Sequence, residues 1–313
     1  MMDLLSVLAV VSSVFMGISI GASSVAPAFG PVNSSGSANV FRSALLAGFF
    51  ALVGAVVQGG NISSTVGSDL ITGDMILLQS VTILLTAAGL VIFSVLTDYP
   101  MPTAFTVVGG VVGSAFGFGN MVNWAVLSKV VLYWLMIPFA ATGISYVIAR
   151  LLRKHVSKEN SARKLRYLLL AMGSYMAYTT GAAAGLAVGP LKPLGIPAGI
   201  SLWLGGLSVL AGAWMYSPRI IRAVSFDYSN IGPRRSIAAL GTAAFLAQIG
   251  IFYGIPISFN EAIIASVIGS GMAGEGSGTE TRKTVRTASA WTGAFLLSGF
   301  ITFLIGTAVT SVH

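Results

Sequence analysis

The sequence predicts an all-α, polytopic membrane protein made of two repeats of inverted topology, with helices that break inside the membrane. Composition, recurring apolar runs and a pair of matched interruptions support this prediction. Of the 313 residues, 55% are hydrophobic and 8% are charged, and the mean hydropathy is +0.87, whereas a soluble domain carries about a quarter charged residues. Apolar runs of roughly 20 residues, the length that spans a bilayer, recur along the chain and indicate about 10–12 membrane segments.

Charge and residue usage exclude several classes of function. The net charge of +8 would suit a nucleic-acid partner, but seven of the 17 basic residues fall between Arg150 and Arg166. Short basic loops between spans mark the cytoplasmic side, so we expect a cytoplasmic linker and no nucleic-acid partner. The chain has no cysteine, and His155 and His313 are not placed to bind a metal. No metal site and no cofactor are therefore expected.

Two glycine-rich stretches interrupt apolar runs, one in each half of the chain. They read GASSVAPAFGP at Gly21 to Pro31 and TGAAAGLAVGP at Thr180 to Pro190. Such a composition within a spanning helix indicates a break that exposes backbone polar groups to a cavity in the membrane. Both stretches end in Ala-x-Gly-Pro, as two copies of one design would.

An ordered series of matches supports the repeat. Corresponding residues lie 156 to 159 positions apart: Gly30 and Gly189, Gly54 and Gly212, Trp134 and Trp291, Pro100 and Pro256. The matches predict a first membrane repeat at 1–152, a basic linker at 153–166 and a second membrane repeat at 167–313. If each repeat crosses the membrane an odd number of times, the copies face opposite ways. Both termini would then lie outside.

Each repeat is expected to hold five apolar segments. In the first repeat they are Leu4 to Ile20, Arg42 to Gly59, Met75 to Leu96, the short Pro100 to Gly119, and Trp124 to Leu152. The second repeat follows the same order, with a span that starts near Tyr167, then Ile200 to Tyr216, a polar connection at Arg219 to Arg235, Ser236 to Gly254, the short Pro256 to Gly274, and a last span from Arg282. Glycine, proline and polar clusters mark the boundaries.

The two short segments are candidates for an anion site. Small residues recur in them every four positions: Gly109, Gly113, Gly117, and Ala265, Gly269, Ala273. That spacing gives each helix a bare face for close packing, and the proline at each start suits the first helical turn. A helix that begins inside the membrane directs free N–H groups into a cavity, where they bind anions. The alternative is a pair of ordinary, tightly packed helices.

Hydroxyl and amide side chains at the two glycine-rich stretches and in the two short segments form the expected lining of a binding site. The candidate substrate-binding residues are Ser23, Ser24, Thr103, Thr106, Thr180, Ser258 and Asn260. For the two serines, the alternative is a hydrogen bond back to a carbonyl of their own helix.

Glu261 is the only carboxylate within the two short segments. An ionisable group at membrane depth is costly and indicates function, and apolar surroundings favour the protonated form, which suits proton carriage. The alternative is a hydrated or salt-bridged position at the mouth of the segment. Lys129 and Arg286, at equivalent places in the two repeats, would either attract an anion or anchor their helices at the interface. Asp69 and Asp74 are interpreted as solvated loop residues.

The same stretches carry a resemblance to a known family. The chain resembles the inorganic phosphate transporter (PiT) family, as a divergent member, including its sulfate-permease branch, over nearly its whole length. That family has a motif of the type GANDVANAxGP in each half, where this chain has GASSVAPAFGP and TGAAAGLAVGP. It has a later segment of the type PxSTTHxIxGxxxG, where this chain has PMPTAFTVVGGVVG and PISFNEAIIASVIG.

This chain departs from the polar residues of those motifs. The Asn-Asp pair falls on Ser23-Ser24 and on Ala182-Ala183, and Ser-Thr-Thr-His falls on 102–105 and 258–261. In the family the carboxylate-bearing pairs are associated with sodium and phosphate binding. We hypothesise that a proton carried by Glu261 replaces sodium here.

The resemblance implies a secondary active symporter of an inorganic oxyanion, not an enzyme. It also implies paired re-entrant hairpins around a central site, usually in a homodimer, in a multi-pass plasma-membrane protein. Phosphate is the first expected substrate, with a proton preferred over sodium as the coupling cation. The alternatives are a sulfate permease of the same fold and a homologue that acts as scaffold or sensor without transport. An ion channel would differ in flux kinetics, and an embedded enzyme would need clustered acidic or histidine residues.

Overall fold

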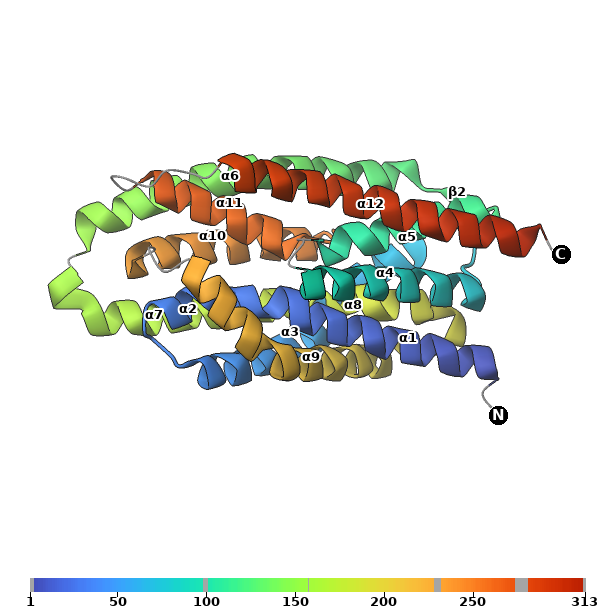
Figure 1. Ribbon diagram of the computed structural model, residues 1–313, viewed down its shortest axis with the longest axis horizontal. Helices are drawn as coiled ribbons and strands as arrows, with labels where there is room; N and C mark the ends of the chain where they lie inside the picture. The colour runs from blue at the N-terminus through green and yellow to red at the C-terminus, as the bar shows by residue number, and fades with distance from the viewer. Residues whose placement is uncertain (1–2, 98–100, 157, 228–231, 274–280, 312–313) are drawn as a thin grey trace.

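The computed structural model describes residues 3–97, 101–156, 158–227, 232–273 and 281–311. The described chain is almost entirely helical, and most of its helices run side by side along the long axis of the molecule (Figure 1). Two short strands, β1 (Ile71–Thr72) and β2 (Met121–Val122), pair antiparallel at one end. The predicted all-α architecture is thus confirmed.

The predicted first repeat contains six α-helices within the described residues. They are α1 (Leu4–Ile20), α2 (Gly30–Ser34), α3 (Val40–Ser64), α4 (Leu77–Thr97), α5 (Thr103–Phe118) and α6 (Trp124–His155). Local side-chain caps account for several of the helix starts. Asp3 accepts a hydrogen bond from the Ser6 amide at 2.8 Å, and Asn39 accepts one from the Arg42 amide at 2.8 Å; such caps satisfy N–H groups that the helix itself leaves free.

The second repeat follows the same order. Its helices are α7 (Lys158–Gly181), α8 (Ala184–Val188), α9 (Ala198–Asp227), α10 (Pro233–Phe252), α11 (Phe259–Met272) and α12 (Thr281–Thr310). The polar connection expected at Arg219 to Arg235 is helical as far as Asp227, and residues 228–231 lie outside the described part. The short segments begin at Thr103 and Phe259, within three residues of the predicted Pro100 and Pro256.

The two glycine-rich stretches differ in geometry. In the first, the chain stays helical through a π-helical turn at Gly21–Val25 and a 3₁₀ turn at Ala26–Phe29. In the second, α7 ends at Gly181, and α8 restarts at Ala184 before a 3₁₀ turn at Gly189–Leu194. The first interruption is therefore a change of helical winding, and the second is a break. α3 likewise continues past its expected end at Gly59 and into a π-helical turn at Thr65–Asp69.

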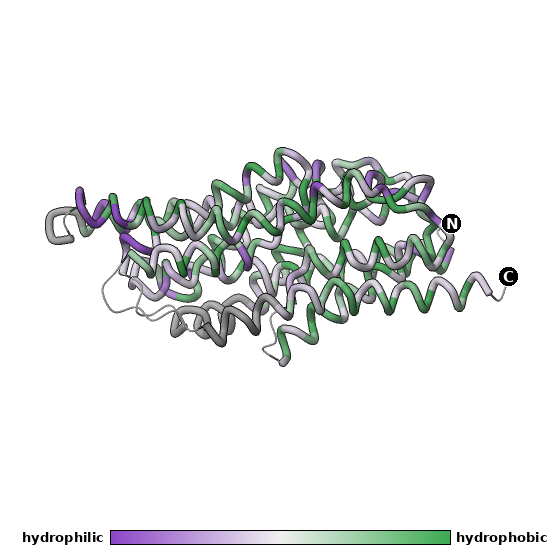
Figure 2. The backbone as a smooth tube through the Cα atoms, turned by 90° about the horizontal axis from the view of Figure 1, so that it is seen from above, coloured by the Kyte–Doolittle hydropathy of each residue, from purple (hydrophilic) through white to green (hydrophobic). Residues whose placement is uncertain are grey.

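Seven helical segments of the described chain are long and apolar enough to span a bilayer, from Leu4–Ser34 to Ser289–Thr310. α5 is a shorter apolar helix. Large apolar side chains such as Phe139, which is 77% exposed, face outward, as they do in a protein surrounded by lipid. Hydrophobic residues occur along most of the length of the molecule (Figure 2).

Helices of the two repeats pack reciprocally. α5 lies against α12, and α11 lies against α6, so each short helix contacts the last helix of the other repeat. Gly113 of α5 faces the Gly299 carbonyl of α12, and Gly269 of α11 faces the Thr142 carbonyl of α6. Any side chain at either glycine would collide with that backbone, because the small-residue face predicted from the spacing brings the helices into direct contact.

Two corresponding hydrogen bonds also join each short helix to the long helix against which it packs. Thr302 Oγ1 donates to the Gly110 carbonyl at 2.9 Å, and Ser145 Oγ donates to the Ser266 carbonyl at 2.6 Å. These four residues occupy corresponding positions in the two repeats. The reciprocity agrees with the predicted repeats, and both their bounds and their inverted orientation in a bilayer stay predictions.

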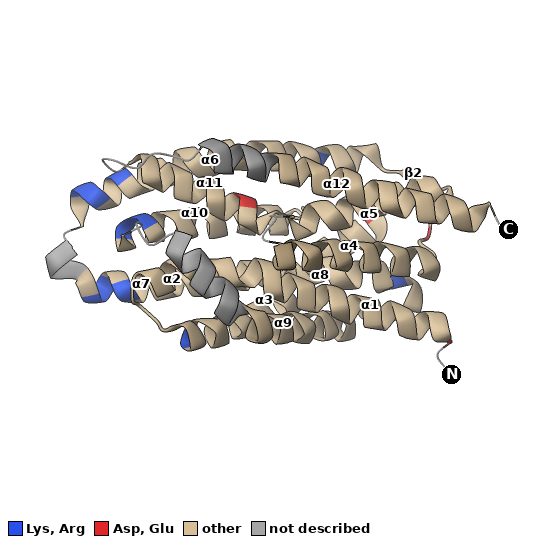
Figure 3. Ribbon diagram, in the orientation of Figure 1, with Lys and Arg blue, Asp and Glu red and all other residues tan. Residues whose placement is uncertain are grey.

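Both termini lie at one end of the molecule, and the α6–α7 connection lies at the opposite end (Figure 1). Lys and Arg residues gather at the α6–α7 end, on the last turns of α6 and the first turns of α7 and α10 (Figure 3). This distribution agrees with the basic linker seen in the sequence.

Candidate functional site

The starts of α5 and α11 lie near the middle of the molecule, and the two helices run from there toward opposite ends (Figure 1). The residues before their first turns are Pro102 and Ser258, both in extended backbone conformation. Each helix start leaves N–H groups without a partner in its own helix and carries the positive end of the helix dipole. Two positive helix ends therefore converge on the central region.

The first glycine-rich stretch supplies hydroxyl groups to this region. Ser24, in the π-helical turn, is 2% exposed, and its Oγ lies 3.4 Å from Thr103 Oγ1 at the start of α5. The Ser23 hydroxyl lies 3.2 Å from that of Ser24. The winding change after α1 thus positions the Ser24 hydroxyl directly against the first short helix.

α11 contributes three polar side chains with an unpaired atom. Ser258 Oγ, Asn260 Oδ1 and Glu261 Oε2 are buried and have no hydrogen-bond partner within the described chain. Ser258 is 1% exposed and Glu261 is 2% exposed. α11 contacts the 3₁₀ turn Ala26–Phe29 that follows Ser24. Since burying an unpaired polar atom costs about 1–3 kcal/mol, three of them in one turn indicate a site that is completed by a ligand or a proton.

Glu261 is buried in this structure, which differs from the hydrated position that the sequence leaves open as an alternative. A hydrated position at the mouth of the segment would leave the carboxylate exposed. Glu261 is the third residue of α11, and its side chain is buried. Among the described residues its Oε2 atom has no hydrogen-bond partner. Its placement agrees with a functional role, which stays a prediction.

An aromatic cluster joins the two helix starts. Trp134 Nε1 of α6 donates a hydrogen bond to the Pro256 carbonyl, just before α11, at 2.7 Å. The ring of Phe105, in the first turn of α5, stacks on Trp134 with 3.8 Å between ring centroids. Phe295 of α12 packs edge-on against Trp134, with centroids 6.3 Å apart. The cluster thereby fixes the spacing of the two helix starts.

Not every predicted site residue is available for a ligand. Ser23 Oγ donates to the Ser19 carbonyl at 2.9 Å, Thr106 Oγ1 donates to the Thr103 carbonyl at 2.8 Å, and Thr180 Oγ1 donates to the Met176 carbonyl at 2.8 Å. For these three the hydroxyl bonds back to its own helix. Ser24, Thr103, Ser258 and Asn260 remain as the polar lining, with Glu261 beside them.

Sequence reasoning missed the role of Phe105 and Trp134. Both carried a signal: Trp134 repeats as Trp291, and Phe105 stands where the family motif has histidine. Lys129 and Asp69 line a cavity together, while the side chain of Arg286 lies outside the described part. Among the described residues, no group of three or more His, Asp or Glu side chains is arranged to hold a metal ion.

Comparison with known proteins agrees with this architecture. The sequence profile of the phosphate transporter family matches residues 20–302. The chain is 30% identical to "Sulfate permease CysP" of Bacillus subtilis, over 95% of this chain and 86% of that protein. It is 23% identical to a putative phosphate permease of Methanocaldococcus jannaschii, over 89% of this chain and 87% of that one.

A solved structure has the same fold. It is titled "The sodium-dependent phosphate transporter" and superposes with a TM-score of 0.88 at 17% identity, over 99% of this chain and 100% of that one. At that identity the similarity concerns the fold alone. The family match covers nearly the whole chain, including both short helices and both glycine-rich stretches. The chain belongs to the phosphate transporter family.

Proposed function

We propose that this protein is a secondary active transporter of a tetrahedral inorganic oxyanion, coupled to protons through Glu261. The observation that carries the proposal is the link between the two helix starts through Phe105, Trp134 and Pro256, with the unpaired polar atoms of Ser258 and Glu261 at the second start. Family membership supports an anion transporter and not an enzyme. The coupling cation and the direct role of each residue are parts of the proposal.

The chemistry of the site suits an oxyanion. Free N–H groups at a helix start and hydroxyl donors both satisfy the oxygens of phosphate or sulfate. Ser24 and Thr103 would donate from one side and Ser258 from the other. A tetrahedral anion has oxygens in all directions, so donors that converge from two opposed helices can enclose it.

Burial of the site implies that transport needs a conformational change. Ser24, Thr103, Ser258 and Glu261 are each less than 5% exposed, so the described state is closed around them. An anion would reach them only when the helices around the short segments rearrange. This is the behaviour of a transporter with alternating access, and it differs from that of an open channel.

Proton coupling rests on the isolation of Glu261 from other charges. The titratable and charged side chains on helices packed against α11 are Lys129, Tyr133, Tyr146, Arg150, Arg153, Lys154 and His155 of α6, and Arg234 and Arg235 of α10. Tyr133 donates to the Leu246 carbonyl, and Arg153 donates to the Ala273 carbonyl at the other end of α11. No hydrogen bond between these groups and Glu261 occurs in the described chain.

Sulfate is the second candidate substrate, and the whole-chain similarity to a sulfate permease favours it. The two anions differ in one respect that matters here. Phosphate carries a proton near neutral pH and can donate a hydrogen bond to an ionised Glu261, whereas sulfate has only acceptors and requires the carboxyl group to be protonated. A proton on Glu261 would therefore enter with sulfate as part of the binding step.

The orientation and assembly belong to the same proposal. The basic α6–α7 end would face the cytoplasm and both termini would lie outside, in a plasma-membrane protein. A homodimer is the expected assembly.

Uptake into proteoliposomes tests the proposal. Radiolabelled phosphate and sulfate are offered separately under an imposed proton gradient or sodium gradient, with a protonophore as control. Accumulation that requires the proton gradient supports the proposal and identifies the anion. Accumulation that requires sodium overturns the coupling, and failure of both anions to accumulate in folded protein favours a scaffold or sensor.

A further inference from the structure

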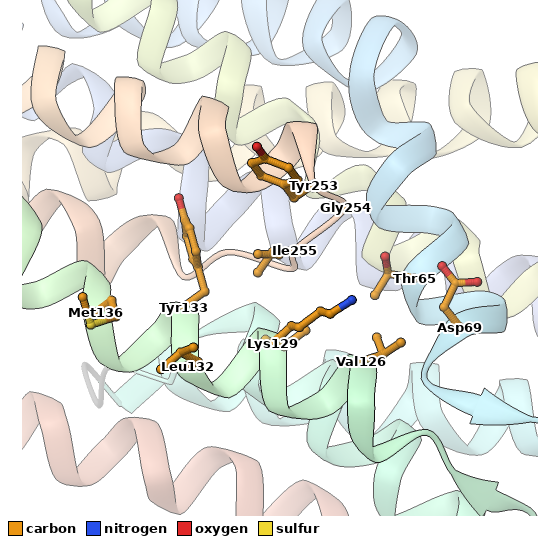
Figure 4. A pocket seen from close by; sticks show the side chains of 11 residues that line it. Thr65, Asp69, Val126, Lys129, Leu132, Tyr133, Met136, Tyr253, Gly254 and Ile255 are labelled. Carbon is orange, nitrogen blue, oxygen red and sulfur yellow. The ribbon is translucent and has the colours of Figure 1, made fainter.

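A cavity of about 580 Å³ lies among three elements of the described chain. Its walls come from three places in the chain: the end of α3 and its π-helical turn, the first half of α6, and the loop Tyr253–Ile255 between α10 and α11 (Figure 4). The volume lies within the range of about 300–1,000 Å³ typical of small-molecule sites. A hydrated inorganic anion fits in it.

The cavity mouth carries one charge of each sign. Lys129 of α6 extends across the cavity toward Thr65 and Asp69, as Figure 4 shows. Both charged side chains are exposed. A charge at the mouth of a low-dielectric cavity raises the local concentration of ions of opposite sign. The mouth can therefore attract an anion beside Lys129 and a cation beside Asp69.

Hydrogen bonds hold the walls of the cavity in place. Asn61 Nδ2 of α3 donates to the Ile251 carbonyl at 3.1 Å, and Gln248 Nε2 donates to Gln58 Oε1 at 2.8 Å, which joins α3 to α10. On the opposite side, the Tyr133 hydroxyl donates to the Leu246 carbonyl. The cavity is thus built between fixed helices.

Two residues that line the cavity are chain neighbours of the aromatic cluster at the candidate site. Tyr133 and Ile255 line the cavity, and the next residue of each, Trp134 and Pro256, form the buried 2.7 Å hydrogen bond. Phe105 stacks on the far side of this bond, and α11 begins three residues after Pro256 with its buried polar groups. Trp134 and Pro256 are thus bonded neighbours of the cavity lining, and Pro256 also leads directly into the start of α11.

We propose that this cavity is the access vestibule through which the transported oxyanion and its coupling cation reach the site, and that the Trp134–Pro256 bond and the Phe105 ring close its floor in this state. The inference rests on the proposed function. Beyond the site residues, it assigns the cavity as the access route, Lys129 and Asp69 as the charges that attract ions to it, and the Trp134–Pro256 bond with the Phe105 ring as the gate.

The absence of cysteine from the chain makes chemical access measurable without background. Val126 lines the cavity and Ser128, two residues on, is exposed outside its lining. Single variants Val126→Cys and Ser128→Cys are treated with two membrane-impermeant methanethiosulfonate reagents, one bearing a sulfonate and one bearing a trimethylammonium group. Modification of Val126→Cys should reduce uptake about tenfold, while modified Ser128→Cys should keep its uptake. Excess phosphate or sulfate should slow modification only at position 126.

The roles of Lys129 and Asp69 are tested by the ratio of two modification rates, that of the anionic reagent and that of the cationic reagent. Mass spectrometry on purified protein measures both rates. Adding Lys129→Met to Val126→Cys should lower the rate of the anionic reagent relative to the cationic one by up to about tenfold, and Asp69→Asn should raise it. Ser128→Cys serves as the control for a general surface effect. The vestibule proposal would be overturned if the ratio of anionic to cationic reagent rates were the same in all variants. It would also be overturned if modified Val126→Cys kept its full uptake.

The failure of this inference is distinct from the failure of the proposed function. Uptake by the unmodified variants reports on transport, whereas the modification rates and their slowing by anions report on the vestibule. If no variant accumulates phosphate or sulfate, the function falls, and the rate ratio still decides whether the cavity is an ion-attracting path.

Discussion

The indole nitrogen of Trp134 lies 2.7 Å from the carbonyl oxygen of Pro256, and this hydrogen bond ties the last helix of the first repeat to the start of the short helix of the second. Trp134 is 5% exposed, so water does not compete for the bond. The geometry of the α11 start, with Ser258 and Glu261 on it, therefore depends on a residue that is far away in sequence.

Trp134→Phe should destabilise the protein and weaken transport. The phenyl ring preserves stacking with Phe105 but leaves the Pro256 carbonyl buried without its donor, which costs about 1–3 kcal/mol. Thermal unfolding in detergent should shift to lower temperature, and uptake should fall. Trp203→Phe, at a position that is 52% exposed, is the matched control and should leave both unchanged. Equal stability of the two variants would contradict the role of the bond.

Glu261→Gln should separate binding from coupling. Glutamine keeps the size and hydrogen-bonding capacity of a protonated carboxyl group but cannot release a proton. Accumulation driven by a pH gradient should drop to the level of protein-free liposomes, while exchange of internal for external anion should continue. Glu261→Asp, which keeps the titratable group, should retain part of the pH-driven uptake. Undiminished accumulation in the glutamine variant would remove Glu261 from the coupling mechanism.

Ser24→Ala and Ser23→Ala should differ although the residues are adjacent. The Ser24 hydroxyl lies against Thr103, whereas the Ser23 hydroxyl donates to Ser19 of its own helix. A hydrogen bond to a charged ligand contributes about 1.5–3 kcal/mol, so loss of the Ser24 donor should raise the KM for the anion about tenfold or more. Ser23→Ala should change the KM less than about twofold. Similar KM values in both variants would show that the anion binds elsewhere.

Gly269→Ala should destabilise the fold, whereas Gly143→Ala should not. A methyl group at Gly269 would meet the Thr142 carbonyl of α6, while at Gly143, one residue further along α6, nothing lies within 4 Å. Overpacking costs about 1–3 kcal/mol or more, and alanine in place of an unhindered helical glycine adds up to about 1 kcal/mol of stability. The thermal midpoints of the two variants should therefore move in opposite directions. A rise in both would show that α6 and α11 are free to separate.

The sequence predicted the short helices well because their signals are local. Proline before each start indicates where a helix begins, and a small residue at every fourth position indicates which face is bare. The helices α5 and α11 begin at Thr103 and Phe259, three residues after the predicted prolines. The first glycine-rich stretch was harder. Its composition indicates irregularity, but a π-helical turn and a 3₁₀ turn keep the backbone bonded without a break, and only three-dimensional packing selects between these outcomes.

The site was predictable in part. The sequence indicated Ser24, Thr103, Ser258 and Glu261 as candidate site residues. All four are buried in the structure. What the sequence could not supply is the partner of each hydroxyl. Thr106 and Thr180 have the right chemistry but bond to their own helices, and Trp134 meets Pro256 only because α6 crosses beside α11. Contacts of that kind depend on helix crossing, which no local pattern encodes.

The glycine contacts between repeats have a mechanical consequence. Where Gly113 touches the backbone of α12 and Gly269 touches the backbone of α6, there is no side chain between the helices that could change rotamer and let one slide past the other. Each short helix is therefore coupled rigidly to the last helix of the opposite repeat. The bodies that rock during a transport cycle would be these crossed pairs, α5 with α12 and α11 with α6, rather than the two halves into which the sequence divides.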